Sequence, residues 1–240
     1  GWATALALAG EGARIVAAAR RKERLDELCN QIVASVGAEG AGVLEVDVQD
    51  REDVRQAIHN LEQAGWGDID ILVNNAGLAS GLEPIQEGLF SDWDRMIDTN
   101  VKGMLNVIRF VLPGMLARGS GHVVNIGSIA GREIYPGGNV YCATKAAVKM
   151  INKGMRIDTV GRGIRVTNVE PGMVETEFSL VRFHGDAERA AKVYEHLTAL
   201  RPEDIADAIV YAVTRPPHVN VEEILVTPTI QASVNHLHRG

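Results

Sequence analysis

Tyr141 and Lys145 are the two residues of this sequence whose types and spacing point most directly to acid–base chemistry. In a helix, side chains four residues apart lie on the same face, about one turn apart. There an ammonium favours the phenolate and lowers the pKa of the tyrosine from about 10 toward neutral pH. Such a tyrosine can accept or donate a proton. The spacing also arises by chance, and the alternative for Tyr141 is an aromatic ring that packs on a neighbouring element.

Along the chain that must hold this pair, short runs of β-branched residues alternate with segments of helical periodicity. This alternation predicts a parallel sheet covered by helices on both faces, a doubly wound Rossmann-type α/β fold. We expect strands at 14–19, 42–46, 69–73, 122–126, 164–169 and 224–226, and helices at 2–9, 24–36, 51–64, 92–118, 140–160, 188–197 and 203–213. Pro113 should bend or end the helix in which it lies.

Small, polar and charged residues directly follow five of the expected strands. These residues are Arg20-Arg21, Asp47, Asn75-Ala76-Gly77, Gly127-Ser128 and Pro171-Gly172. Ligands of doubly wound sheets bind outside the carboxyl ends of the strands, so the pattern predicts one binding site there. The alternative is that the glycines and asparagines only serve turns.

The composition of the sequence argues against several classes of binding partner. The 240 residues are 46% hydrophobic and carry a net charge of −7, without a long basic run, which argues against nucleic acid as a partner. No apolar stretch approaches the roughly 18 residues that would indicate a membrane span. Cys29 and Cys142 lack metal or redox spacing, and we expect Cys142 to pack; the histidines suggest no metal site. Without a signal peptide the sequence favours a cytoplasmic protein.

Over nearly its whole length the chain resembles the short-chain dehydrogenases/reductases. The matching marks are Asn74-Asn75-Ala76-Gly77, Asn100, Ser128, Tyr141 with Lys145, and Pro171-Gly172. Within that family it is most similar to the NADP-dependent 3-hydroxy acid dehydrogenases, the group that includes serine and L-allo-threonine dehydrogenases. The segments that carry this similarity are 97–100, 137–141, 170–174 and 176–186.

The resemblance implies a role for each of four residues. Tyr141 is the catalytic acid/base, and Lys145 lowers its pKa while holding the nicotinamide ribose. Ser128 binds the substrate oxygen. Asn100 holds a water that links Lys145 to solvent, with helix capping as the alternative. In this chemistry a hydride passes from the carbinol carbon to the nicotinamide, and Tyr141 takes the hydroxyl proton.

The cofactor is expected to be NADP. Arg20 and Arg21 follow a strand without an acidic residue at its end, and arginine there suits a 2′-phosphate. The alternative is that both are solvated charges at the start of the next helix. The resemblance assigns further cofactor contacts to Gly1, Asp47, Val48, Asn75, Ala76, Gly77, Tyr141, Lys145, Pro171, Gly172, Val174 and Thr176.

Gly1 matches the last glycine of the family's glycine-rich turn. We therefore expect one dinucleotide-binding oxidoreductase domain over residues 1–240, with its N-terminal first strand and glycine turn missing. The resemblance also implies a homotetramer formed through helices 92–118 and 140–160, which carry apolar residues on more than one side. The alternative for these helices is burial against the sheet alone.

Arg182 is the candidate for the substrate carboxylate. A desolvated carboxylate needs a cation or several donors, and Arg182 lies where this fold places a lid. The alternative is a structural salt bridge to Glu177 or Asp186. Arg132 and Glu133 are further candidates for contacting charged groups.

The leading hypothesis is an oxidoreductase that transfers a hydride between NADP(H) and a 3-hydroxy acid or 3-hydroxy amino acid, such as serine or allo-threonine. Ser128, Tyr141 and Arg182 would contact this small-molecule substrate. One alternative is an NADPH-dependent reductase of small aldehydes, ketones or semialdehydes. Another is a non-catalytic nucleotide-binding or oligomerising chain.

Overall fold

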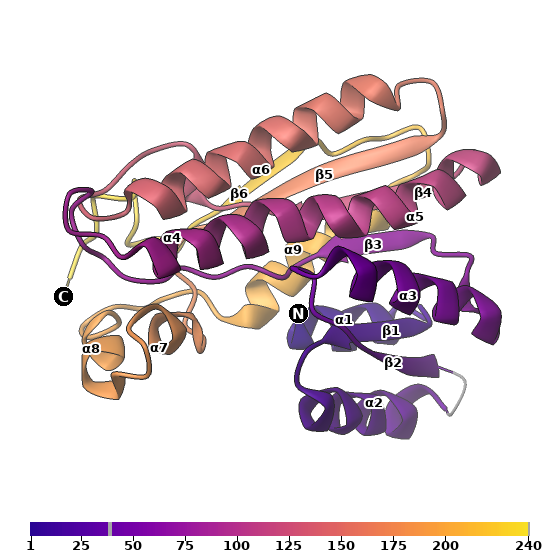
Figure 1. Ribbon diagram of the computed structural model, residues 1–240, viewed down its shortest axis with the longest axis horizontal. Helices are drawn as coiled ribbons and strands as arrows, with labels where there is room; N and C mark the ends of the chain where they lie inside the picture. Colours follow the sequence, from indigo (N-terminus) through magenta and orange to yellow (C-terminus); the bar gives the residue numbers. More distant parts are fainter. Residues whose placement is uncertain (38–39, 240) are drawn as a thin grey trace.

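The computed structural model describes residues 1–37 and 40–239, and its strands all pair in parallel (Figure 1). They are β1 (Ile15–Ala19), β2 (Ala41–Glu45), β3 (Ile71–Asn74), β4 (Gly121–Ile126), β5 (Ile164–Pro171) and β6 (Glu223–Val226). The Rossmann-type α/β fold is confirmed, and each of the six predicted strands is present. Within the described ranges the strands form two sheets, β1-β2 and β3-β4-β5-β6. Hydrophobic periodicity records burial rather than pairing partners, so it could not predict this division.

Helices cover both faces of the four-stranded sheet. Figure 1 shows α5 (Met104–Arg118) and α6 (Asn139–Asp158) running along one side, with α1 (Trp2–Gly10) and α9 (Pro202–Val213) on the other. Two neighbouring residues of β4 separate the cores. Val123 packs with α5 and α6, whereas Val124 packs with α1 and α9, because successive side chains of a strand point to opposite faces. The sheet is therefore buried on both sides, as parallel sheets usually are.

Most predicted helices agree with the structure. The helices α1, α2 (Lys22–Val36), α3 (Arg51–Leu61), α6 and α9 start and end within three residues of the expected positions. In the chain as described, none of the helices is long and apolar enough to cross a membrane.

The predicted helix at 92–118 is interrupted. It consists of α4 (Phe90–Ile97), a π-helical turn at Asp98–Gly103, and α5. Pro113 does not end the helix, since α5 continues to Arg118. Pro113 and Arg109 are both exposed, so the carbonyl that loses its helical partner faces water.

The prediction for 188–197 is only partly right. The helix α8 (Ala187–Lys192) ends five residues early, and the short helix α7 (Phe178–Arg182) was not predicted. These two helices form a small lobe that extends from the rest of the fold (Figure 1). The Tyr194 hydroxyl joins the lobe to the chain that enters it. It accepts a hydrogen bond from Ser179 Oγ at 3.0 Å and donates one to the Val174 carbonyl at 3.1 Å.

Candidate active site

The carboxyl ends of β3, β4 and β5 lie side by side. Their parallel register pairs Asn74 with Asn125 and Asn125 with Asn168. The residues that follow these positions therefore meet at one edge of the sheet, as predicted from the sequence. The segment Asn75–Gly77 follows β3, Ser128 follows β4, and Pro171-Gly172 ends β5.

Tyr141 lies in the first turn of α6 and is only 8% exposed. Its ring meets the Phe178 ring edge-on at 5.6 Å. Burial raises the pKa of Tyr141 well above its usual value, and the neighbouring Ser128 hydroxyl offsets this only in part. The pKa of Tyr141 is therefore raised rather than lowered in this structure, which contradicts the expected net direction. Lys145 Nζ lies 6.0 Å from the ring centroid, and its own effect on this pKa stays a prediction.

Lys145 is a buried cation with few partners. It is 6% exposed, and its Nζ donates a hydrogen bond to the Ile126 carbonyl at 2.8 Å. In the described parts of the chain no carboxylate forms an ion pair with it. Burial lowers the pKa of Lys145 to about 8. The remaining N–H groups of the ammonium are available to a ligand.

Gly77 gives access to this ammonium. A Cβ atom at Gly77 would lie 3.3 Å from Lys145 Nζ and 3.3 Å from Asn100 Oδ1, although Gly77 itself is exposed. A larger residue would therefore cover the cation. This arrangement leaves room for a ligand hydroxyl to reach the Lys145 ammonium past the exposed Gly77.

Asn100 holds the loop that passes over Lys145. It lies in the π-helical turn and is 2% exposed. Its Nδ2 donates to the Leu78 carbonyl at 2.8 Å and to Thr144 Oγ1 at 3.0 Å, while its Oδ1 accepts from the Leu78 N–H at 2.8 Å. Both amide hydrogens are thus used within the protein. Its role in a water relay stays a prediction.

The predicted 2′-phosphate residues lie beside the β1 strand end. Arg20 and Arg21 are both exposed, and Arg20 lies 3.8 Å from Asp47, which brings two of the predicted cofactor residues together. Arg21 instead pairs at 3.1 Å with Glu177, just before α7. Sequence reasoning missed this ion pair because its partners are far apart along the chain. Val48 faces the helical layer, where its carbonyl accepts a hydrogen bond from Asn106 at 2.9 Å.

Gly1 contacts the predicted cofactor segment after β3. It stands at the N-cap of α1, and its nitrogen donates to Asn75 Oδ1 at 3.1 Å, next to the exposed Ala76. A Cβ atom at Gly1 would meet the Asn75 amide at 2.9 Å. The N-terminal end of a helix suits an anion, so this position fits a phosphate group.

The predicted cofactor residues Pro171, Gly172, Val174 and Thr176 lie between the end of β5 and the start of α7. A Cβ atom at Gly172 would clash with Gln231 Oε1, which accepts a hydrogen bond from the Met173 N–H at 2.8 Å. Thr176 Oγ1 accepts from the Phe178 N–H at 3.2 Å, and Val174 is held by Tyr194 as described above. Gln231 and Tyr194 support the site without any local motif that could have revealed them.

A narrow cleft lies beside Tyr141 and is also lined by Arg182. Arg182 Nε donates to the Gly81 carbonyl at 3.1 Å, and the guanidinium Cζ lies 5.2 Å from the centroid of the Tyr135 ring. Its Cζ lies 5.8 Å from the centroid of the Tyr141 ring. Arg182 thus lies over the ring of Tyr141.

The alternative salt bridge of Arg182 is wrong for the described residues. Glu177 pairs with Arg21 and Arg24, and Asp186 caps α8 by accepting from the Arg189 N–H.

The expected roles of Arg132 and Glu133 are also not supported. Arg132 pairs with Glu170, and Glu133 accepts a hydrogen bond from the Val234 N–H, so protein groups engage both side chains. Cys142 is buried and its thiol pKa is raised by burial, which agrees with a packing role.

Known proteins share this fold and sequence. A sequence model described as short chain dehydrogenase matches residues 1–214. The NADP-dependent 3-hydroxy acid dehydrogenase of Salmonella typhi is 47% identical over 222 residues, which cover 92% of this chain and 87% of the relative.

Two solved structures agree with this comparison. One, described as the closed form of serine dehydrogenase complexed with NADP+, aligns with a TM-score of 0.92 at 42% identity, covering 99% of this chain and 94% of the other. Serine dehydrogenase from Escherichia coli aligns with a TM-score of 0.82 at 38% identity, covering 97% and 95%. With the family model matched over most of its length, the chain belongs to the short-chain dehydrogenase family.

Proposed function

We propose that this protein is an NADP-dependent dehydrogenase of 3-hydroxy acids, including 3-hydroxy amino acids such as serine and allo-threonine. The observation that carries the proposal is the pair of buried residues Tyr141 and Lys145 on one helix, with Tyr141 also lining the cleft to which Arg182 belongs. The names of the Salmonella relative and of the NADP+-bound serine dehydrogenase support both the cofactor and the substrate class.

The site fits NADP(H) in its charges and its open space. Lys145 has N–H groups available for ribose hydroxyls beneath Gly77, and exposed Arg20 and Arg21 suit the 2′-phosphate. When bound, NADP+ supplies the acceptor for the hydride of the carbinol carbon. The remaining cofactor contacts would come from Gly1, Asp47, Val48, Asn75, Ala76, Pro171, Gly172, Val174 and Thr176.

The proton chemistry belongs to the protein. Ser128 donates a hydrogen bond to the substrate oxygen, and Tyr141 accepts the hydroxyl proton during oxidation or returns it during reduction. Lys145 supplies a cation that favours the phenolate, and Asn100 keeps the Gly77–Leu78 segment in place over that cation. A relay water near Asn100 would return the proton to solvent.

The same site also suits the reductive direction. Burial raises the pKa of Tyr141, so its phenol is protonated near neutral pH. A protonated phenol is the acid that carbonyl reduction requires. An NADPH-dependent reductase of small aldehydes, ketones or semialdehydes would therefore use the same residues.

We further propose that Arg182 binds the substrate carboxylate. Its guanidinium lies beside the Tyr141 ring and in the same cleft, and it forms no ion pair with any carboxylate among the described residues. A carboxylate in this cleft would complete the hydrogen bonding of the guanidinium.

Replacing Tyr141 by phenylalanine should abolish most turnover. We expect kcat for NADP+-dependent oxidation of L-allo-threonine to fall about 10²- to 10⁴-fold, because the variant cannot accept the proton. NADPH formation measures the rate. Tyr211→Phe, on the exposed side of α9, serves as the control and should keep normal turnover. Normal kcat in Tyr141→Phe would remove Tyr141 as the acid/base.

Replacing Arg182 by methionine should separate acids from neutral alcohols. We expect KM for L-allo-threonine to rise about 10- to 100-fold, the usual worth of a charged hydrogen bond, while KM for a neutral secondary alcohol of similar size changes little. Arg189→Met is the matched control. Arg189 lies in the same lobe, but its guanidinium stacks on the Phe183 ring rather than on Tyr141. Equal effects on both substrates would contradict the proposed carboxylate contact.

Replacing Lys145 by methionine should move the pH profile of oxidation. The phenolate form of Tyr141 increases with pH, so wild-type kcat for oxidation should rise between pH 7 and 9. Without the ammonium the phenolate is less favourable, and the profile should shift by about one pH unit or more to higher pH. Lys153→Met, two turns further along α6, controls for general effects. An unshifted profile in Lys145→Met would show that the cation does not tune Tyr141.

We also propose a cytoplasmic homotetramer formed through α4–α5 and α6. Five large apolar side chains of these helices are exposed, namely Phe90, Ile97, Leu105, Met150 and Ile157. Both cysteines are free thiols, as expected in a reducing compartment. Sedimentation velocity at micromolar concentration should give four times the chain mass for wild type and a smaller species for Ile157→Glu. A monomeric wild type would contradict the assembly.

A further inference from the structure

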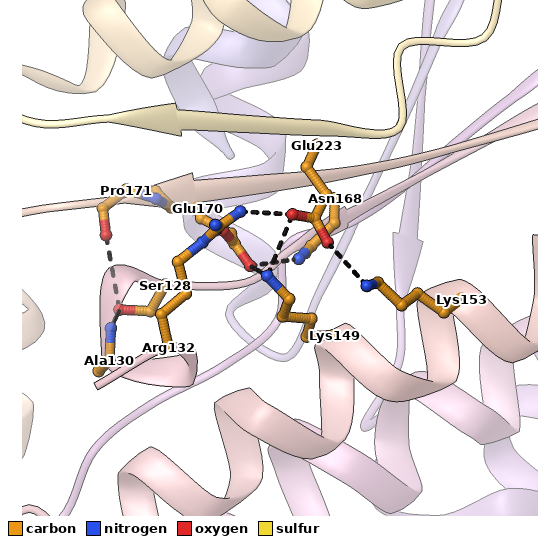
Figure 2. Close-up of polar contacts among 9 residues, drawn as sticks. All are labelled: Ser128, Ala130, Arg132, Lys149, Lys153, Asn168, Glu170, Pro171 and Glu223. Carbon is orange, nitrogen blue, oxygen red and sulfur yellow. Dashed lines mark hydrogen bonds and ion pairs between the residues drawn. The ribbon is translucent and has the colours of Figure 1, made fainter. Parts of the chain in front are cut away.

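A cluster of five charged residues lies next to Ser128 (Figure 2). We call it the Glu170 cluster; its members are Arg132, Lys149, Lys153, Glu170 and Glu223. Glu170 is completely buried near the end of β5 and directly precedes Pro171. Its Oε2 pairs with Arg132 Nε, and its Oε1 accepts from Asn168 Nδ2 at 2.8 Å. Such a buried carboxylate requires partners of this kind.

Arg132 joins two strands through this cluster. Besides Glu170 on β5, its guanidinium contacts Glu223 Oε2 on β6, with Nη2 at 2.5 Å. Lys149 on α6 approaches the same two carboxylates, at 3.5 Å from Glu170 Oε1 and 3.0 Å from Glu223 Oε2. The planar guanidinium can reach two carboxylates at once, a geometry that a lysine at the same position cannot reproduce.

The backbone of Arg132 is linked to Ser128 through one short turn. Ser128 caps the short 3-10 turn Ile129–Gly131, and Arg132 closes that turn. The Gly131 N–H donates to the Ser128 carbonyl at 2.9 Å, and the Arg132 N–H donates to the Ile129 carbonyl at 2.9 Å. A displacement of Arg132 would therefore be transmitted through one compact turn to Ser128.

The other end of the ion pair also reaches Ser128. Glu170 is bonded to Pro171, whose carbonyl lies 3.5 Å from Ser128 Oγ. That contact is long for a hydroxyl hydrogen bond, and the remaining bond of the hydroxyl within its own turn is to the Ala130 N–H at 3.1 Å. The Arg132–Glu170 pair thus makes a stronger connection between the β4 and β5 ends than Ser128 makes itself.

We propose that Arg132 is a positioning residue that fixes the Ser128 hydroxyl relative to Tyr141, by anchoring the turn after β4 to Glu170 and Glu223. The inference rests on the proposed role of Ser128 in binding the substrate oxygen. Displacing a catalytic hydrogen-bond donor by even a small distance slows a reaction strongly, so the effect of Arg132 should appear in kcat.

Lys153 provides the matched control. It belongs to the same cluster, at 3.9 Å from Glu223 Oε1, but it lies on α6, and among the described residues its ion pairs reach the Ser128 turn only indirectly, through Glu223 and Arg132. Removing it deletes one cation from the cluster and leaves the Arg132–Glu170 pair in place. A general effect of cluster charge would appear in both variants.

The test is a double-mutant cycle of Arg132 with Ser128. We expect Arg132→Met to lower kcat for L-allo-threonine oxidation about 10- to 100-fold, with the NADP+ dissociation constant within about twofold of wild type. Lys153→Met should stay within about twofold in both quantities. In a Ser128→Ala background, Arg132→Met should change the remaining kcat by less than about twofold, because the group it positions is gone.

The possible results separate the claims. An unchanged kcat in Arg132→Met, an equal loss in Lys153→Met, or a full additional loss in the Ser128→Ala background would each overturn the positioning role. Normal kcat in Ser128→Ala alone would instead contradict the proposed role of Ser128. If Arg132→Met does not fold, Arg132→Lys replaces it in the same cycle. This variant keeps the charge but loses the bridge, so a partial loss of kcat that vanishes without Ser128 supports the proposal.

Discussion

Lys145 carries an ammonium into the protein, where it is 6% exposed and donates to the Ile126 carbonyl without a carboxylate counter-ion among the described residues. Desolvation of this charge is unfavourable and lowers the pKa of Lys145 to about 8. A ligand that offers hydroxyl or negatively charged oxygens would offset that penalty. The same burial raises the pKa of Tyr141 on the same helix face, so one feature sets the proton affinity of both reactive groups.

Three lysines on one face of α6 differ in their partners. Lys145, Lys149 and Lys153 follow one another at intervals of four residues and therefore share a helix face. Lys149 and Lys153 pair with carboxylates of β5 and β6, whereas Lys145 lies under Gly77 at the open end of the sheet. Paired charges on α6 hold the strands to the helix, and the unpaired charge is left for a ligand. Ser128 is connected to the paired charges through its own turn and through Pro171, because Arg132 and Glu170 adjoin these segments.

Local patterns in the sequence predicted the strands, the fold class and the residues that meet at the strand ends, because each of these residues directly follows a strand. The pKa of Tyr141 was predicted in the wrong direction, since it depends on burial that no local pattern records. The pairs Arg21–Glu177 and Arg132–Glu170 join residues far apart in sequence, and the π-helical turn at Asn100 depends on bonds to Leu78. Such features follow from tertiary packing, which overrides local propensity.

The most direct test of this account is the proton affinity of Lys145 itself. The Nζ resonance of Lys145 can be followed by NMR in protein labelled with ¹⁵N-lysine, assigned by its absence in Lys145→Met, and titrated before and after addition of NADP+. The account predicts a pKa of about 8 in the protein alone, rising when the cofactor binds, because the ligand compensates a buried charge. A pKa at the ordinary lysine value of about 10.4, or one that NADP+ leaves unchanged, would contradict it.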